Sequence, residues 1–285
     1  MDMWEAVIVG GGPAGLSAGL HLSRAGHRVI LVEKGRLGGQ ARGLGRLENY
    51  PGFLSINSDR LMDRWLRQAR LWGLKTCRAE VRRIRRAQQG FLLSLDQGRG
   101  LSAQAVVYCP GAIFKDLGVP GEKRLLGRGV FHEAGDEVSR WKGRAVVVAG
   151  GGEAAAHQAL ALARSARKVF LICRGEKIRA HRLLQKRLAS SGRIVKVFGA
   201  EVCRVLGKKR VQAVEIRSRA GLTRISAAAL FVLVGKIPAR LPWSRSPAGF
   251  FVAGDAQGWP FRQVAIASGD GMRAAMECIR FLEKP

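Results

Sequence analysis

The sequence predicts an α/β protein with two Rossmann-like nucleotide-binding domains. Its 285 residues are long enough for two cores of ordinary size. A β-branched run leads into a glycine turn near the N-terminus, and the same order of strand, glycine turn and helix returns near residue 144. A third strand meets a glycine turn close to the C-terminus. Strands that alternate with helices in this way are typical of parallel sheets.

The first predicted unit occupies the N-terminal segment. Residues 6–12, AVIVGGG, combine a short β-branched strand with a glycine turn. Residues 13–26 have the leucine spacing and the alanine content of a helix, and a second strand follows at 28–34. This order predicts a β-α-β unit.

The glycines of this unit have a spacing typical of dinucleotide sites. Gly10, Gly12 and Gly15 form a Gly-x-Gly-x-x-Gly pattern, and Glu33 ends the second strand. The first glycine allows a tight turn, the second lets a pyrophosphate approach the backbone, and the third lets the helix close on the strand. The helix N-terminus then faces the phosphates, and the glutamate accepts the ribose hydroxyls.

The second predicted unit repeats this order. A strand is predicted at 144–150, a turn at 151–156, a helix at 157–166 and a strand at 168–174. Gly150, Gly152 and Ala155 fill the Gly-x-Gly-x-x-Ala positions.

The second strand of this unit ends at Cys173 and Arg174, where the first unit has an acid. An arginine there favours an extra phosphate, as on the adenosine ribose of NADP. Two such units indicate electron transfer between two cofactors. The alternative is that one unit is functional and the other vestigial.

The third signal lies near the C-terminus. The strand in GFFVAGDAQ, residues 249–257, runs into Gly254 and Asp255, and residues 261–282 are predicted to form a helix. An aspartate after a glycine turn can hold a ribityl hydroxyl. The free N–H groups of the helix would face the pyrimidine end of a flavin.

The composition of the chain indicates neither a membrane-spanning segment nor a disulfide framework. No apolar run approaches the length that spans a bilayer, and the N-terminus has no basic segment followed by an apolar one, so we expect a cytoplasmic protein. The five cysteines are dispersed, with no Cys-x-x-Cys spacing. We expect them to be buried small hydrophobic residues, with no disulfide framework and no metal site.

The formal net charge of +28 is extreme. Such a field attracts polyanions: anionic lipid at a membrane periphery, an acidic protein, or nucleic acid. Nucleic acid is the least favoured of the three, because the sequence has no nucleic-acid-binding motif. The alternative is a general arginine bias with solvated charges.

Several motifs together resemble the thioredoxin reductase branch of the FAD- and NAD(P)-dependent disulfide oxidoreductases. Their order and spacing agree with that family over nearly the whole chain. The motifs are GGGPAG (10–15), GGQ (38–40), ENYPG (48–52), LGVPGE (117–122), GGGEAA (150–155), VAGDAQ (252–257) and FRQVAIASGDG (261–271).

The resemblance implies three-layer ββα-type domains, with the second inserted in the first. The FAD domain would comprise residues 1–115 and 239–285, and the NAD(P)-type domain residues 116–238. It also implies a homodimer whose domains swivel about two linkers.

The resemblance also implies which residues contact the cofactors. The expected FAD contacts are Gly10, Gly12, Pro13, Ala14, Gly15, Glu33, Lys34, Gly39, Gln40, Asn49, Gly111, Gly254, Asp255, Arg262, Gln263 and Val264. The expected contacts of the second nucleotide are Gly150, Gly152, Glu153, Ala154, Arg174 and Arg179. The family's His-Arg-Arg phosphate clamp is partial, because Cys173 and Gly175 replace its histidine and its second arginine. The second site is therefore expected to hold NADP(H) or a second FAD.

The segment GVFHEAGDEV, residues 129–138, departs from the family. Counted back from Gly150, Glu133 and Asp136 occupy the positions of the family's redox cysteines, and Glu137 that of its acid. Carboxylates cannot exchange electrons with a flavin, so this segment cannot reduce thioredoxin in the usual way. Three roles are open for this segment. Its acids stabilise a helix N-terminus, or they pair with the chain's own arginines. In the third alternative, Glu137 or His132 transfers protons beside the flavin.

A second departure follows residue 238. The family has a longer segment with a hairpin where this chain keeps only ARLPWSRSPA, residues 239–248. Trp243 and Trp259 flank the shortened segment. We expect them to pack on core residues; the alternative is stacking on a ring or on lipid.

These observations predict a flavin-dependent oxidoreductase without the usual Cys-x-x-Cys. Its FAD would exchange electrons with NADPH, a second flavin, an acidic ferredoxin-like protein or a thiol partner. Cys109 is a further candidate thiol, although packing is the more ordinary role for it. The alternative of another class is a flavin-binding interaction or sensor module without turnover.

Overall fold

The computed structural model describes residues 3–96, 98–132 and 138–284. The chain divides into two compact units. Unit 1 comprises residues 1–113 and 238–285, and unit 2 comprises residues 114–237. Each unit is an α/β sandwich of the Rossmann type, so the predicted fold class is confirmed.

Unit 1 is built on a mostly parallel sheet with the strand order β5-β2-β1-β8-β7-β6, and β19 also pairs with β8. Strands β1, β2, β5, β8 and β19 pair in parallel, whereas β6 and β7 form an antiparallel extension of β8. The strands are β1 (Trp4–Val9), β2 (Val29–Glu33), β5 (Lys75–Arg78), β6 (Val81–Arg86), β7 (Phe91–Leu95), β8 (Gly100–Tyr108) and β19 (Phe250–Val252).

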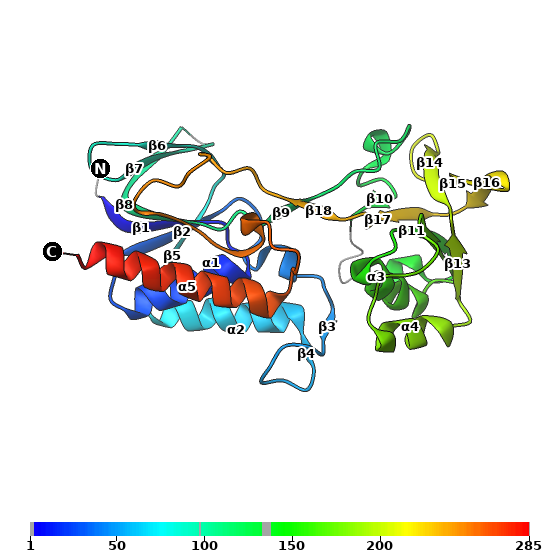
Figure 1. Ribbon diagram of the computed structural model, residues 1–285, viewed down its shortest axis with the longest axis horizontal. Helices are drawn as coiled ribbons and strands as arrows, with labels where there is room; N and C mark the ends of the chain where they lie inside the picture. The colour runs from blue at the N-terminus through cyan, green and yellow to red at the C-terminus, as the bar shows by residue number, and fades with distance from the viewer. Residues whose placement is uncertain (1–2, 97, 133–137, 285) are drawn as a thin grey trace. The chain divides into compact units, whose positions relative to one another are not determined.

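The sheet of unit 1 is covered differently on its two faces (Figure 1). Helices α1 (Pro13–Arg24), α2 (Ser58–Leu71) and α5 (Val264–Leu282) pack on one face around Leu16, Leu22 and Leu31. Strands β6 and β7 fold over the other face around Phe91 and Leu93. This arrangement gives the helix, sheet and meander layers of the predicted ββα type.

Unit 2 has the same layers. Its parallel sheet has the order β10-β17-β11-β12-β13, with helices α3 and α4 packed on one face and the antiparallel sheet β14-β15-β16 on the other. Its elements are β10 (Val130–Phe131), β11 (Ala145–Ala149), α3 (Glu153–Ala163), β12 (Lys168–Cys173), α4 (Arg182–Ala189), β13 (Ile194–Phe198), β14 (Glu201–Leu206), β15 (Ala213–Ser218), β16 (Gly221–Ser226) and β17 (Ala229–Val232).

The chain passes between the units through two short strands that pair with each other. They are β9 (Ala112–Phe114) and β18 (Lys236–Pro238). The remaining short elements are the strands β3 (Arg46–Leu47) and β4 (Ile56–Asn57) and the 3-10 helices η1 (Gly39–Ala41), η2 (Lys123–Leu125), η3 (Val138–Trp141) and η4 (Gly254–Gln257).

Two predicted helices have different bounds. The helix predicted from residue 157 begins at Glu153, because the alanines after Gly152 favour a helix and not a turn. The helix predicted from residue 261 begins at Val264, because Gln263 is still in an extended conformation.

Trp243 packs against Phe91 and Phe250, with ring centroids 6.1 and 4.9 Å away, as the core interpretation predicted. Trp259, in contrast, is half exposed, so the expectation that it packs in the core is wrong.

Candidate functional site

The N-terminal glycine loop is shaped by close backbone contacts. Gly10 has a φ of 101°, and a Cβ there would lie 2.2 Å from the carbonyl oxygen of Cys109. A Cβ on Gly15 would lie 1.9 Å from the carbonyl oxygen of Gly10. A Cβ on Gly12, in contrast, would meet no atom of the described chain within 4 Å. The loop is therefore tightly packed on its inner side and open at Gly12.

The open side of this loop carries backbone donors. Gly12 is the N-cap of α1, no side chain caps the helix there, and the first turn contains no acidic residue. Pro13 follows as the first helical residue and supplies no N–H. The helix thus presents unoccupied backbone N–H groups and its positive dipole end to this space, which is the usual environment of a bound phosphate.

Glu33 lies beside the glycine loop at the end of β2. Its Oε2 accepts a hydrogen bond from the backbone N–H of Gly11 at 2.6 Å, and its Oε1 accepts one from Gly35 at 2.7 Å. Two backbone bonds fix the carboxylate, and each oxygen keeps acceptor capacity for a further donor. The arrangement fits a ribose diol next to a pyrophosphate. The neighbouring Lys34 instead pairs with Glu80 at 3.3 Å.

Residues from distant parts of the sequence complete this side of unit 1. The side-chain amide of Asn49 donates to Oε1 of Gln263 at 3.0 Å, although 214 positions separate them. Gln40 donates to the carbonyl oxygen of Ala112. Among the further predicted contacts, Gly39 and Gly111 both have positive φ values.

The C-terminal motif packs against the same loop. A Cβ on Gly254 would lie 2.9 Å from Cβ of Ala14, and one on Gly271 would lie 2.0 Å from the Ala14 carbonyl oxygen. These glycines let η4, which contains Asp255, and helix α5 approach the start of α1. The start of α1 therefore lies against η4 and the N-terminal half of α5.

The start of α5 offers further donors. Val264 opens the helix, and no side chain caps it at Gln263. The Nε of Arg262 is buried and has no hydrogen-bond partner within the described residues. An orphaned buried guanidinium nitrogen next to an uncapped helix N-terminus fits a ligand with acceptor atoms, such as the pyrimidine end of a flavin.

Arg42 was not predicted as part of this region. Its side chain is 8% exposed and pairs with Asp59 at 3.0 Å and with Asp63 at 2.6 Å, while its Nε donates to the carbonyl oxygen of Leu37. Burial lowers the pKa of Arg42, but the hydrogen bonds to the two carboxylates outweigh it and the pKa is raised. Arg42 therefore fixes the loop that carries Gly39 and Gln40 to helix α2. No motif indicates this pairing.

The second glycine turn has a similar geometry in unit 2. A Cβ on Gly150 would lie 2.3 Å from the carbonyl oxygen of Leu233, whereas one on Gly152 would meet no described atom within 4 Å. Glu153 and Ala154 then begin α3. The turn again combines a tight inner side with an open position at the helix N-terminus.

The basic residues predicted for this second site are exposed. Arg174 follows β12, and Arg179 is held near the turn because its N–H donates to the carbonyl oxygen of Gly151 at 2.7 Å. Both guanidinium groups are therefore available to an anion.

His132 lies in unit 2 after β10. Its Nδ1 lies 3.3 Å from the carbonyl oxygen of Val232, its Nε2 lies 3.4 Å from Oδ1 of Asp116, and its ring stacks on Phe114 at 5.0 Å. The three contacts fix the ring plane. Glu133, Asp136 and Glu137 lie outside the described residues, so their predicted roles stay predictions.

The cysteines are free thiols, and three of them are buried: Cys109, Cys173 and Cys278. Burial, together with the nearby charge of Asp270, raises the pKa of the Cys109 thiol far above its usual range. Burial and the charge of Glu5 raise the pKa of Cys278 to about 12. Both thiols therefore stay protonated and unreactive at neutral pH.

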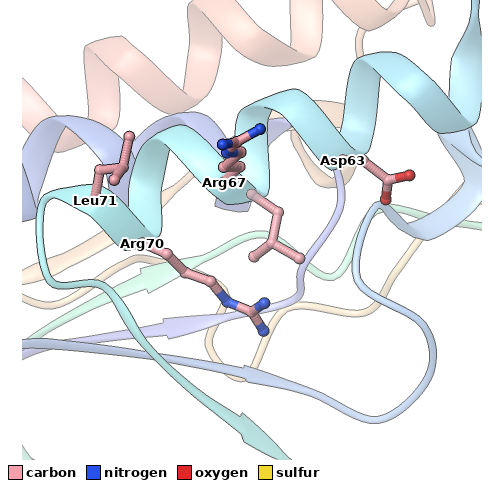
Figure 2. A pocket seen from close by; sticks show the side chains of 5 residues that line it. Asp63, Arg67, Arg70 and Leu71 are labelled. Carbon is pink, nitrogen blue, oxygen red and sulfur yellow. The ribbon is translucent and has the colours of Figure 1, made fainter.

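A surface pocket lies elsewhere, along helix α2 (Figure 2). Its lining consists of Asp63, Leu66, Arg67, Arg70 and Leu71. None of these residues belongs to the predicted nucleotide contacts. Within the described part of the chain, no helix combines the length and apolar character needed to cross a membrane.

The chain is similar to known proteins over almost its whole length. Residues 4–269 match the pyridine nucleotide-disulphide oxidoreductase family. Thioredoxin reductase from Treponema pallidum is 31% identical, with 98% of this chain and 97% of that protein covered, and the enzyme from Bacillus subtilis is 29% identical, with 99% and 96% covered. The crystal structure of Lactococcus lactis thioredoxin reductase superposes with a TM-score of 0.93 at 26% identity and covers 98% of this chain and 99% of that one.

Fold, glycine loops and similarity agree on the class of protein. The loop, the carboxylate of Glu33 and the uncapped helix ends suit FAD, the cofactor of this class. The chain belongs to the pyridine nucleotide-disulphide oxidoreductase family and is a flavin-dependent oxidoreductase of the thioredoxin reductase-like branch.

Proposed function

We propose that unit 1 holds FAD with its pyrophosphate at the Gly10–Gly15 loop and its adenosine ribose at Glu33. The flavin end would lie at Asp255, Arg262 and the N-terminus of α5. The support is the open position at Gly12, the two-point fixation of Glu33 and the orphaned Nε of Arg262. When bound, FAD supplies a centre that accepts and releases electrons; the chain's residues bind it and orient it.

We further propose that electrons do not leave this flavin through a Cys-x-x-Cys pair. The observation that carries the proposal is chemical: the sequence has no such pair, and carboxylates stand where the related enzymes have one. The raised pKa values of Cys109 and Cys278 give no support to a substitute thiol there. Reduction of thioredoxin, the activity named for the relatives, is therefore not expected through this segment.

The second glycine turn supports a nucleotide partner in unit 2. Gly152 leaves space at the N-terminus of α3, and Arg174 and Arg179 offer exposed guanidinium groups. These features favour NADPH as electron donor, although Gly175 removes one arginine of the family clamp. The alternatives are a second FAD in this site and an acidic electron-carrier protein on the basic surface.

His132 is the described candidate for proton transfer. The Val232 carbonyl oxygen lies 3.3 Å from Nδ1 and holds the ring, whereas Oδ1 of Asp116 lies 3.4 Å from Nε2. Proton transfer by Nε2 would therefore require Asp116 to give up this contact. We keep Glu137 as a second candidate on sequence grounds alone.

A homodimer also stays a proposal; the exposed apolar side chains of Ile266, Met272 and Met276 on α5 offer one surface for it.

Two measurements on the purified full chain test these proposals. The first is the identity and number of cofactors released on denaturation: two flavins per chain overturn the NADPH assignment, and one FAD per chain supports the proposal for unit 1 and leaves the donor to the second measurement. A protein that stays colourless after incubation with FAD overturns the proposal for unit 1.

The second measurement is the visible spectrum after anaerobic addition of a donor. Rapid flavin bleaching by NADPH supports a pyridine-nucleotide donor. Bleaching by reduced ferredoxin or a dithiol alone overturns that assignment in favour of the carrier or thiol variants. Rapid turnover with thioredoxin as acceptor would contradict the proposed loss of the disulfide step.

A further inference from the structure

A group of potential metal ligands lies at the adjoining ends of two helices in unit 2. Glu153, His157 and His181 each offer one ligand atom, and these atoms lie within 4.8 Å of one another. Glu153 and His157 are four residues apart on α3, so they lie on the same face of that helix. His181 is the N-cap of α4. We call these three residues the Glu-His-His cluster.

The chemistry of the cluster selects a class of cation. Two imidazole nitrogens and one carboxylate oxygen form a zinc ligand set that leaves a fourth position for water. Magnesium and calcium prefer sites made of oxygen atoms alone. We propose that the Glu-His-His cluster binds one zinc ion.

The distances are close to those that zinc requires. Nε2 of His181 lies 3.3 Å from Oε1 of Glu153. Two ligands of a tetrahedral zinc ion lie about 3.4 Å apart, because each metal–ligand bond is about 2.1 Å long. The ring of His157 lies 6.3 Å from that of His181, so a side-chain rotation must bring it nearer. His157 is exposed.

The backbone under the cluster is fixed. Helix α3 is anchored by the buried Ala155, Ala156 and Ala159. The segment before His181 is tied to the glycine turn, because the N–H of Arg179 donates to the carbonyl oxygen of Gly151. The metal therefore has to order side chains only.

Binding also carries two costs. Nδ1 of His181 accepts the N–H of Leu184 at 3.4 Å, and a metal on Nε2 places a proton on Nδ1, so this weak cap bond is lost. The nearby Arg179 and Arg182 carry positive charge, which opposes a cation. The Glu153 carboxylate offsets part of that repulsion and is thus a necessary ligand. Cysteine spacing does not indicate this cluster, because none of its three ligands is a cysteine; the expectation of no metal site rested on that spacing.

The test is equilibrium dialysis of the tag-free, FAD-loaded full chain, first treated with EDTA, against zinc chloride. We expect the unaltered chain to bind zinc. The zinc affinity should fall by at least about tenfold in His157→Gln, in His181→Asn and in Glu153→Gln, because the loss of even an outer-shell partner costs about that much. His181→Asn keeps a side chain that caps α4, so a loss of zinc there is not a loss of the helix.

The matched control is His21→Gln, which removes an imidazole from α1 of unit 1 and leaves zinc binding unchanged. All variants keep the five cysteines, so zinc held by thiols does not differ between them. Zinc should also raise the unfolding temperature of the unaltered protein and not that of the cluster variants. Unaltered chain that retains no zinc, or equal zinc in the unaltered chain and either histidine variant, overturns the proposal. Glu153 is also an expected contact of the second nucleotide, so the dialysis is carried out without nucleotide. A chain without zinc would then leave the NADPH proposal unaffected, because the flavin spectrum tests that proposal separately.

Discussion

At the scale of single residues, Gly12 and Gly15 of the same loop are glycines for different physical reasons. Gly15 is needed by the fold, since any Cβ there collides with the carbonyl oxygen of Gly10. Gly12 has free space around its Cβ direction and an ordinary negative φ of −73°, so the fold alone tolerates a larger residue. In the proposed binding mode, Gly12 is instead needed by FAD, whose pyrophosphate would approach the backbone there.

We expect Gly12→Ala and Gly15→Ala to separate these roles. Gly12→Ala should leave the free energy of unfolding of the FAD-free protein within about 1 kcal/mol of the original value, while FAD affinity falls by at least about tenfold, because the methyl group occupies the path of the pyrophosphate. Gly15→Ala should lower the free energy of unfolding by about 2–3 kcal/mol through overpacking. Chemical denaturation and FAD titration measure the two quantities. Unchanged FAD affinity in Gly12→Ala would contradict the proposed binding mode.

At the scale of elements, ion pairs attach loops and strands to one another. Arg42 and Asp59 are largely buried, with side chains that are 8% and 15% exposed, whereas Asp63 is 64% exposed. Arg36 contacts the same Asp59 at 3.1 Å with a side chain that is 68% exposed. The two arginines thus share a partner and differ in burial.

Removing the buried arginine should cost far more than removing the exposed one. Arg42→Met removes the buried cation from Asp59, which keeps Arg36 at 3.1 Å, and it leaves the Leu37 carbonyl oxygen without the Arg42 donor. We expect a loss of about 1–3 kcal/mol in the free energy of unfolding. Arg36→Ala serves as the control and should cost less than about 1 kcal/mol. Urea denaturation at constant pH compares them. Equal effects of the two substitutions would show that burial does not set the strength of this pair.

A second pairing joins the starts of β1 and β2. Glu5 accepts the N–H of Arg28 at 2.7 Å and pairs with Nδ1 of His27 at 2.9 Å. Burial raises the pKa of Glu5, but the hydrogen bonds from Arg28 and His27 outweigh it, so the pKa is lowered from 4.5. A lowered carboxyl pKa stabilises the fold above the unfolded value and loses this effect as the pH falls through the folded value.

Glu5→Gln should therefore destabilise the protein above pH 4.5 and have a shrinking effect below it. Because Glu5 is partly exposed, we expect a difference below about 1 kcal/mol. Denaturation curves at a series of acidic pH values measure the difference in the free energy of unfolding. A difference that grows toward low pH would reverse the sign and refute the account.

The elements also show what sequence alone can predict. The strand, glycine and helix order predicted β1, α1, β11 and β12 because each signal is local. The pairing of Arg42 with Asp59 and Asp63 could not be predicted, since it joins segments that no motif links. The Glu-His-His cluster had a partial local signal in the four-residue spacing of Glu153 and His157. Its third member comes from another helix.

At the scale of the whole molecule, the positive charge is spread over many exposed side chains. Strand β6 exposes arginines, and helix α2 carries more of them along its outer face, two of which line the pocket of Figure 2. A field of this sign should speed the encounter with an acidic electron carrier.

We expect the rate of flavin reduction by an acidic ferredoxin to fall by about tenfold or more when the ionic strength rises from about 0.01 to about 1 M. The reason is that the Debye length shrinks from about 30 to about 3 Å over this range. Stopped-flow spectroscopy measures this rate. Reduction by NADPH, a small donor bound in a site of its own, serves as the comparison and should change less. A ferredoxin rate independent of salt would leave the surface charge without a role in this encounter.

Unit 1 takes its strands and helices from both ends of the chain, and β19 and α5 come last. On the ribosome, unit 2 is therefore translated in full before the N-terminal β-α-β unit meets the helix that closes over it. The proposed flavin site is therefore completed only after unit 2 has been translated. In a nascent polypeptide arrested before residue 250, unit 2 should fold, but the chain should be unable to retain FAD.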